Sequence, residues 1–430
     1  MTTYPPSISI TPKAKIDETL DVPGSKSLTN RAFVVASLAD GISTLRGGLI
    51  AEDSEVMIKA LNALGLIVEG PVISNQGTTF TVHGRGGNIP KNQAELDLRL
   101  SGTSIRFLTA MVALGQGKYK LDGNERMRQR PIQDLLGSLE KLGVKLGTEF
   151  ETGCPPVVVE ANGMKGGVTS VAGDRSSQFL SGLLMSAPYA KESVTIHVTG
   201  ELQSKPFIDM TLKLMGDFGV SVERNGYASF TIHPQVYKAR DYLIEGDAMA
   251  AGYFWAAAAI TGGRVKVTNV GLTSVQGDKR LASVLEEMGC KVTWTDTTCE
   301  VVGTQNLKGG TFDLNDMPDQ AQTLAVVGLF ASSPVRIENV WNMRIKETDR
   351  LAALNVELTK FGAKVEEGQD YIVVHPLKNY PQSVDVATYG DHRMAMAFAL
   401  AGLRIPNITI QDPACVAKTF PEFFDVLTAL

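Results

Sequence analysis

The stretch Glu55–Gly70 reads EVMIKALNALGLIVEG, and its pattern recurs along the whole chain. Apolar residues at helical spacing lead to Gly65, and an alternating run typical of a β-strand follows. A glycine at that point predicts a helix that ends in a left-handed cap before the strand begins. The stretch therefore predicts one helix–glycine–strand unit.

Four more copies of this unit follow. They are PIQDLLGSLEKLGVKLG (131–147), IDMTLKLMGDFGVSVE (208–223), DKRLASVLEEMGCKVTW (278–294) and DRLAALNVELTKFGAKVEEG (349–368). Their glycines, Gly143, Gly219, Gly289 and Gly362, follow Gly65 at intervals of 70 to 78 residues. A sixth copy is FFDVLTAL (423–430). Chance recurrence of common helix endings is the alternative to a repeat.

A second marker keeps the same period. It is a segment rich in small residues that starts with polar ones, and its copies begin at Ser27, Ser101, Ser176, Ala248, Asp319 and Asp391. Two markers in phase indicate six repeats rather than chance. Segments such as FWAAAAITGG (254–263) lack a broad polar face, which is typical of buried helices. The prediction is an α/β fold with helices inside and sheets outside.

The period shortens slightly after the third repeat, which favours a three-plus-three grouping. We predict a first domain over 21–245 and a second over 246–430. Residues 1–20 are expected to cross back and complete the second domain, with hinge crossovers near 20 and 246 and a cleft between the domains.

Composition excludes several classes of protein. The 430 residues are 43% hydrophobic and 20% charged with a net charge of -5, which gives no general attraction for nucleic acid or an anionic membrane. The four cysteines are widely spaced without a CxxC pair and the histidines are scattered, so neither a disulfide framework nor a metal site is expected. No apolar run is long enough to span a bilayer, and no signal peptide pattern is present. A cytoplasmic location is expected.

The stretch VPGSKSLTNRAF (22–33) resembles a phosphate cradle, with Lys26 in a turn of small residues. A nucleotide-binding P-loop needs two glycines that bracket four residues ahead of its Lys-Ser/Thr pair. The residues upstream of Gly24 contain no glycine over KIDETLDVP, so a nucleotide loop is excluded and another anion site is predicted.

Polar residues gather at the start of every predicted buried helix, where backbone N–H groups favour anions. Ser27 and Asp319 have the alternative role of simple N-caps. N-caps do not account for the basic residues grouped with them, which are Lys26, Arg31, Arg106 and Arg393. Two further basic groups come from connecting segments and Lys418 lies near the C-terminus; the groups are Arg126, Arg128 and Arg130, and Arg344, Lys346 and Arg350. So many cations at corresponding places in an acidic protein predict a multiply anionic ligand.

Two carboxylates stand among these cations. In KETDRL (346–351), Lys346 and Arg350 are four apart and are expected to share a helix face, with Glu347 beside them. A carboxylate there is suited to proton transfer, and a surface ladder of i,i+4 charges is the alternative. Asp319 is the second candidate acid or base.

Eight motifs resemble those of the enolpyruvyl transferase family, and specifically 5-enolpyruvylshikimate-3-phosphate synthases. They are VPGSKSLTNRA, RMRQRPIQDL, SSQFLSGLLMSAP, SKPFIDMTL, DMPDQAQTLAV, MRIKETDRL, YGDHRMAMAFAL and KTFPEFF, in order through both halves. The resemblance implies a two-domain inside-out α/β barrel with three βαβαββ units in each domain. It also implies transfer of the enolpyruvyl group of phosphoenolpyruvate to the 5-hydroxyl of shikimate 3-phosphate, without metal or organic cofactor, in chorismate biosynthesis.

The resemblance also implies residue roles. The expected catalytic residues are Asp319, Glu347 and Lys26. Shikimate 3-phosphate is expected at Lys26, Ser27, Arg31, Ser176, Ser177, Gln178, Ser204, Asp319, Asn342 and Lys346. Phosphoenolpyruvate is expected at Lys26, Gly102, Arg130, Gln178, Arg350, Arg393 and Lys418. His392 is expected behind these contacts.

Three positions depart from the family pattern. Leu100 stands where the family commonly has an asparagine, Phe107 where it has a proline, and Phe207 where a tyrosine often meets the substrate. These departures predict an altered affinity for phosphoenolpyruvate and an altered response to the herbicide glyphosate.

Two alternatives remain open. The related enzyme acting on UDP-N-acetylglucosamine carries a reactive cysteine before the Arg-Pro of its loop, and GNERMRQRP (123–131) has none. A six-unit nucleic-acid clamp would need a broadly basic helix face, whereas these cations lie at helix ends. We expect a monomer whose domains close when both substrates bind.

Overall fold

The computed structural model describes residues 4–74 and 77–430. The chain divides into two units, which we name by their place in the sequence. The central unit is the continuous stretch Gly24–Ile244, and the terminal unit combines Met1–Pro23 with Glu245–Leu430. Each unit holds three sheets and three buried helices, and each is described by itself.

The central unit contains three four-stranded sheets. Their strand orders are β14(Asp241–Leu243)-β3(Asp40–Arg46)-β5(Gly77–Arg85)-β4(Val68–Ser74), β6(Gln93–Asp97)-β7(Gln116–Asp122)-β9(Val157–Asn162)-β8(Lys145–Thr148) and β10(Gly167–Ala172)-β11(Val194–Thr199)-β13(Ser229–Ile232)-β12(Glu223–Asn225). In each sheet the first pair of strands is parallel and the remaining pairs are antiparallel. Parallel neighbours need a long crossover, and a buried helix supplies it in the second and third sheets. The result is a βαβαββ repeat.

The terminal unit repeats this arrangement with strands from both ends of its sequence. Its sheets are β2(Asp17–Leu20)-β15(Arg264–Val267)-β17(Cys299–Val302)-β16(Lys291–Trp294), β18(Gly310–Asp313)-β19(Val335–Glu338)-β21(Ile372–Val374)-β20(Val365–Glu367) and β22(Val384–Val386)-β23(Ile408–Gln411)-β1(Ser7–Ile10). Strand β2 pairs with β15 in parallel, and β1 pairs with β23 antiparallel. The first strands of the chain therefore complete sheets formed by its second half.

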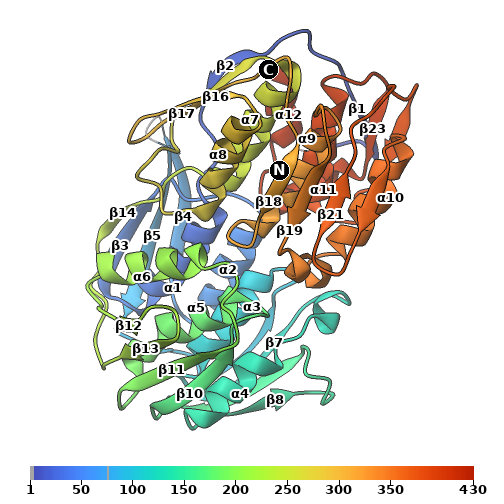
Figure 1. The fold of residues 1–430 in the computed structure, drawn as a ribbon. Coiled ribbons are helices and arrows are strands. Elements are labelled where there is room, and N and C mark those ends of the chain that lie inside the picture. Colours follow the sequence, from blue (N-terminus) through green and yellow to red (C-terminus); the bar gives the residue numbers. More distant parts are fainter. Residues whose placement is uncertain (1–3, 75–76) are drawn as a thin grey trace. The chain divides into compact units, whose positions relative to one another are not determined.

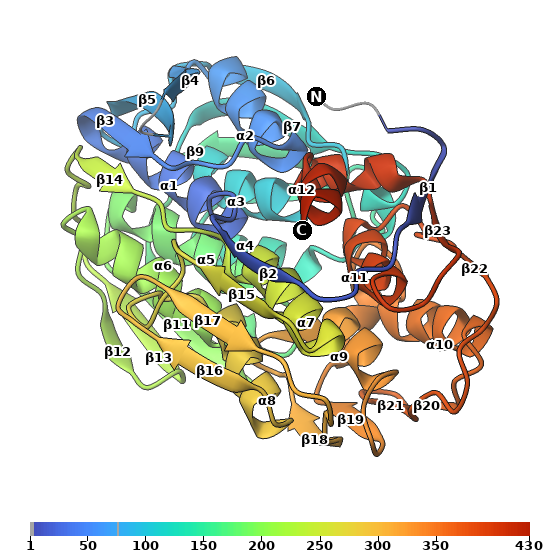
Figure 2. The same cartoon turned by 90° about the horizontal axis from the view of Figure 1, so that it is seen from above.

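The six segments rich in small residues form buried helices, as predicted. They are α1(Lys26–Leu38), α3(Gly102–Val112) and α5(Ser177–Ser186) in the central unit, and α7(Ala248–Thr261), α9(Ala321–Gly328) and α11(His392–Gly402) in the terminal unit. In the terminal unit these helices pack on one another, and the sheets lie outside them (Figures 1 and 2). The small side chains of these helices permit this packing, because a helix that is buried on all sides must let its neighbours approach closely.

The outer helices end at the glycines of the first marker. These helices are α2(Glu52–Ala63), α4(Gln133–Lys141), α6(Pro206–Asp217), α8(Arg280–Glu287) and α10(Arg350–Lys360), and the shorter α12(Phe423–Ala429) follows the last sheet. Gly65, Gly143, Gly219, Gly289 and Gly362 all have positive φ, between 81° and 106°. At Gly219 the next amide, of Val220, donates to the carbonyl of Met215 at 2.9 Å, which closes the helix end. The predicted left-handed caps are confirmed.

The predicted α/β class and its repeat of buried helix and outer sheet are confirmed as well. Each sheet is open at its edges, and among the described strands none closes into a barrel. The term inside-out barrel thus describes helices inside and sheets outside. None of the helices in the described ranges is long and apolar enough to cross a membrane.

Candidate functional site

The start of α1 holds the first predicted anion site. Ser25, rather than Ser27, is the N-cap, since its hydroxyl accepts from the amide of Leu28 at 3.4 Å. Ser27 lies in the first turn, and its carbonyl accepts from Nη1 of Arg31 at 3.0 Å. Lys26 Nζ lies 3.7 Å from Oδ2 of the buried Asp53. Capping therefore does not explain Ser27, and its hydroxyl stays a candidate ligand.

Arg31 is buried inside the central unit, with 1% of its surface exposed. Its Nε donates to Oγ1 of Thr211 at 2.8 Å, and Nη2 donates to Oγ of Ser181 at 3.2 Å. No carboxylate among the described residues pairs with it. Burial lowers the pKa of Arg31 to about 9, which still leaves the guanidinium charged at neutral pH.

Arg130 is a second buried arginine of this unit, and it lies beside the start of α3. Its Nε and Nη1 have no hydrogen-bond partner among the described residues. A Cβ at Gly102 would lie 2.7 Å from both of its terminal nitrogens, so any larger residue there would force the guanidinium to move. Arg128, which belongs to the same predicted basic group, does not join Arg130 at the start of α3. It pairs with Asp122 at 2.6 Å.

The starts of α3 and α5 meet through side chains. Arg106 Nη1 donates to Oε1 of Gln178, whose Nε2 donates to Oγ1 of Thr103 at 3.0 Å. Ser176 is the N-cap of α5, and Ser177 is buried in its first turn. Before α6, the buried Ser204 has a φ of 57°, which is rare for a residue other than glycine.

In the terminal unit, Arg350 is the centre of a buried ionic cluster. Its Nε and Nη2 donate to the two oxygens of Asp391 at 2.7 and 3.2 Å. Nη1 donates to Oδ1 of Asp319 at 2.8 Å, and Nη2 to Oε2 of Glu347 at 3.1 Å. Burial alone would lower the pKa of Arg350, but the three carboxylates outweigh it and raise that pKa.

Asp319 joins three cations. Besides Arg350, its Oδ1 lies 3.4 Å from Nζ of Lys346 and its Oδ2 lies 3.0 Å from Nη2 of Arg393. It stands in a short 3-10 helix, Pro318–Gln320, and does not cap α9. The capping alternative is therefore wrong for Asp319.

Glu347 also bridges two cations, since its Oε1 accepts from Nζ of Lys418 while Oε2 faces Arg350. The predicted shared helix face of Lys346 and Arg350 is wrong, because a 3-10 helix ends at Ile345 and α10 starts only at Arg350, capped by Asp349. The surface-ladder alternative is also wrong, because the side chains of Glu347 and Arg350 are 9% and 1% exposed.

The sequence did not identify two acidic residues of this cluster. Asp391 is fully buried, caps α11 and holds Arg350, and its place before a buried helix was the only signal. Asp278 is buried with Oδ1 unpaired among the described residues, and no pattern pointed to it. Burial, followed by the charge of Asp319, raises the pKa of Asp278 to about 7.

Two further residues predicted from the sequence, His392 and Asn342, are buried in the terminal unit. Both ring nitrogens of His392 lack a hydrogen-bond partner in the part of the chain that the structure describes, and burial, then the charge of Arg393, lowers its pKa. Asn342 is buried in the 3-10 helix Trp341–Ile345. Across the described ranges, no group of three or more His, Cys, Asp or Glu side chains could hold a metal ion.

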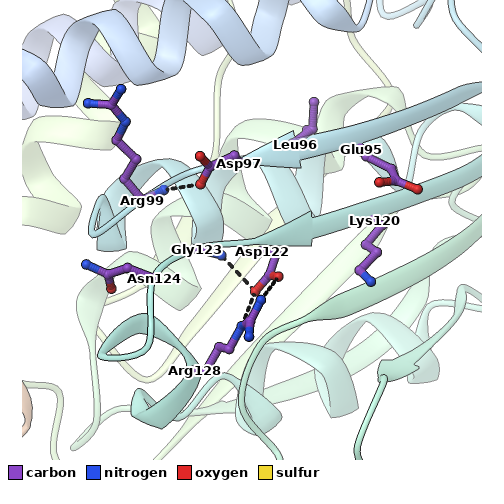
Figure 3. Close-up of a pocket in the computed structure, with 9 residues that line it drawn as sticks. All are labelled: Glu95, Leu96, Asp97, Arg99, Lys120, Asp122, Gly123, Asn124 and Arg128. Carbon is purple, nitrogen blue, oxygen red and sulfur yellow. Dashed lines mark hydrogen bonds and ion pairs between the residues drawn. The ribbon is translucent and has the colours of Figure 1, made fainter.

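A hollow of about 600 Å³ on the central unit holds none of the residues expected to contact the two substrates, although Arg128 of the predicted basic group lines it (Figure 3). It lies at the ends of β6 and β7 and is lined by charged residues that already have partners. Arg99 binds Glu52 at 2.7 Å, and Lys120 binds Glu149 at 2.7 Å. The hollow has the character of an ordinary solvated surface.

The two units thus offer different chemistry. The central unit presents buried arginines without acidic partners, which suits the binding of an anion. The terminal unit presents carboxylates paired with cations, which suits proton transfer once a ligand displaces a partner.

Comparisons with known proteins identify the family of the chain. A family model described as EPSP synthase (3-phosphoshikimate 1-carboxyvinyltransferase) matches residues 10–427. The 3-phosphoshikimate 1-carboxyvinyltransferase of Trichormus variabilis is 47% identical over 95% of both chains. That of Marinomonas sp. is 44% identical over 99% of both. A solved EPSP synthase from Acinetobacter baumannii superposes with a TM-score of 0.82 at 25% identity, over 98% of both chains. The chain is therefore a member of the EPSP synthase family of carboxyvinyl transferases.

Proposed function

We propose that the protein transfers the enolpyruvyl group of phosphoenolpyruvate to the 5-hydroxyl of shikimate 3-phosphate and releases phosphate, a step of aromatic amino acid biosynthesis. The observation that carries the proposal is the pair of buried arginines, Arg31 and Arg130, with no carboxylate partner among the described residues. A buried charge is costly unless it is paired, so both sites call for an anionic ligand.

The central unit is proposed to bind most of shikimate 3-phosphate. Arg31 and Lys26 supply charge, and the first turns of α1 and α5 supply hydroxyls and N–H groups. The proposed contacts are Lys26, Ser27, Arg31, Ser176, Ser177, Gln178 and Ser204, with Asp319, Asn342 and Lys346 from the terminal unit.

Phosphoenolpyruvate is proposed to bind the cations of the ionic cluster in place of their carboxylate partners. Its phosphate and carboxylate would meet Arg130, Arg350, Arg393 and Lys418, beside Lys26, Gly102 and Gln178. Lys418 and Arg393 bind Glu347 and Asp319 in the present structure. When the anionic substrate takes over these cations, both carboxylates lose a partner and become free to accept a proton.

The proposed reaction has two stages. Glu347 gives a proton to the methylene carbon of phosphoenolpyruvate, and the 5-hydroxyl attacks the adjacent carbon while Asp319 accepts its proton. The resulting tetrahedral adduct then reverses the proton flow: the new methyl group returns a proton to Glu347, the proton on Asp319 passes to the departing phosphate, and the double bond is restored as the C–O bond to phosphate breaks. Lys26 stabilises negative charge between the two substrates.

The test is release of phosphate from phosphoenolpyruvate with each of two acceptors. Release with shikimate 3-phosphate and none with UDP-N-acetylglucosamine is expected. Release only with UDP-N-acetylglucosamine would replace the proposal with the related activity. Asp319→Asn and Glu347→Gln should each abolish turnover while the fold is kept, since neither change alters the size of the side chain much.

The protein is further proposed to act as a cytoplasmic monomer without binding nucleic acid. Its net charge of -5 supports the last point. Light scattering at several concentrations tests whether the protein is a monomer. A salt titration against mixed DNA tests whether it binds nucleic acid. A constant mass near that of one chain and no retention on DNA are expected.

A further inference from the structure

Arg31 and Arg350 are both buried, but they are stabilised in opposite ways. Arg350 is surrounded by three carboxylates, which cancel its charge. Arg31 is stabilised by contact with two aromatic rings instead. Its Cζ lies 5.1 Å from the centroid of the Phe107 ring and 5.8 Å from that of Phe207.

The rings come from two different elements that converge on α1. Phe107 is fully buried in α3, and the half-buried Phe207 is in the first turn of α6. A guanidinium over a ring face is attracted by the electrons of the ring, and more strongly where water is excluded. Unlike a carboxylate, a ring gives this stabilisation without cancelling the positive charge.

The hydrogen bonds of Arg31 leave one donor unused. A guanidinium has five N–H groups. Four have acceptors, which are Thr211, Ser181 and the carbonyls of Ser27 and Phe207. The fifth is on Nη1, beside the first turn of α1, and has no acceptor among the described residues.

We propose that Phe107 and Phe207 are positioning residues for the anionic acceptor substrate. They fix the plane of the Arg31 guanidinium and keep its full charge and its last N–H for a carboxylate or phosphate of that substrate. This inference rests on the proposed function, in which Arg31 meets shikimate 3-phosphate. It also links two departures from the family pattern, since both rings act on the same arginine.

The experiment removes each ring separately. Phe107→Leu and Phe207→Leu are expected to raise KM and the dissociation constant for shikimate 3-phosphate about three- to tenfold. The turnover number and KM for phosphoenolpyruvate should change less than about twofold, by the same scale, so at Phe107 and Phe207 this inference replaces the effect on phosphoenolpyruvate that the family pattern suggested. Phe207→Tyr keeps a ring over Arg31, so its affinity for shikimate 3-phosphate should not fall as it does in Phe207→Leu. Phe230→Leu is the matched control for Phe107→Leu, because Phe230 is equally buried in the central unit and no arginine of the described residues stacks on it.

A double-mutant cycle separates positioning from packing. In an Arg31→Gln background, removing either ring should weaken shikimate 3-phosphate binding no further. Equal losses in both backgrounds, or losses that match those of Phe230→Leu, would overturn the inference. If Phe107→Leu unfolds, the half-buried Phe207 still decides the outcome. Failure of the wild-type protein to use shikimate 3-phosphate would instead contradict the proposed function.

Discussion

Gly102 is the position where a side chain would press directly on a predicted substrate-binding residue. Gly102→Ala would place a methyl group 2.7 Å from the terminal nitrogens of Arg130, and the guanidinium would have to move. We expect KM for phosphoenolpyruvate to rise about tenfold, the loss of roughly one charge-assisted hydrogen bond, with little change in thermal stability. Gly137→Ala, in α4, is the control, because a Cβ there meets nothing within 4 Å. Equal KM values in the two variants would show that Arg130 does not bind this substrate.

Asp278 gives the protein a pH-dependent stability. Its pKa is about 7 in the folded protein, against an ordinary 3.8, because of burial and the nearby charge of Asp319. Between these values the folded state holds a proton that the unfolded chain has released, so stability falls as pH rises from about 4 through 7. The full loss is on the order of 4 kcal/mol.

Asp278→Asn removes this titration. Relative to wild type, the variant should gain stability as the pH of a urea unfolding experiment is raised from 5 to 8, and the gain should be on the order of a few kcal/mol. Asp241→Asn changes an exposed carboxylate and should show no such trend. Parallel pH profiles for wild type and Asp278→Asn would mean that Asp278 is ionised in the folded protein.

The site shows what residue patterns can and cannot predict. The cations of the cluster and the carboxylates Asp319 and Glu347 were identified from the sequence, and their roles toward substrates stay predictions. Their pairing was not predicted, because Arg350 reaches Asp391 across 41 positions of sequence and only packing brings them together. Asp278 was missed for the same reason, since nothing local marks a buried carboxylate.

At the scale of elements, the glycine caps were predictable because their cause is local. A positive φ is strained for any residue with a Cβ, so the chain places glycine after each of the five outer helices that end in a left-handed cap. The break before α10 was also local, yet it was missed. Asp349 accepts from the amide of Ala352 at 3.1 Å as an N-cap, so the apparent helix of KETDRL begins four residues later than the charge pattern suggested.

Gly216, inside α6, and Gly219, just after its end, allow a clean test of this cause. Gly219→Ala forces a side chain into a φ of 86° and should lower the unfolding free energy by about 1 kcal/mol or more. Gly216→Ala, three residues earlier in the helix, meets nothing within 4 Å and should be neutral or stabilise by about 0.5–1 kcal/mol. Equal effects in urea denaturation would contradict the role of backbone strain.

At the scale of the whole molecule, the proposal assigns the acceptor substrate mainly to one unit and the proton-transfer groups to the other. The reaction then requires the units to come together, which also excludes water. Small-angle scattering should show a smaller radius of gyration when shikimate 3-phosphate and glyphosate are added together than with neither. No compaction at saturating ligand would contradict closure, and Arg31→Gln should need more shikimate 3-phosphate to reach the same change.

The pairing of β1 and β2 with β23 and β15 has a consequence for the order of events during synthesis. The central unit is one continuous stretch and can fold while the ribosome is still making the remainder of the chain. The first two strands leave the ribosome earliest but find their neighbours only after that unit has been made. Until then they are exposed strand-forming segments, which need protection from pairing with other nascent chains.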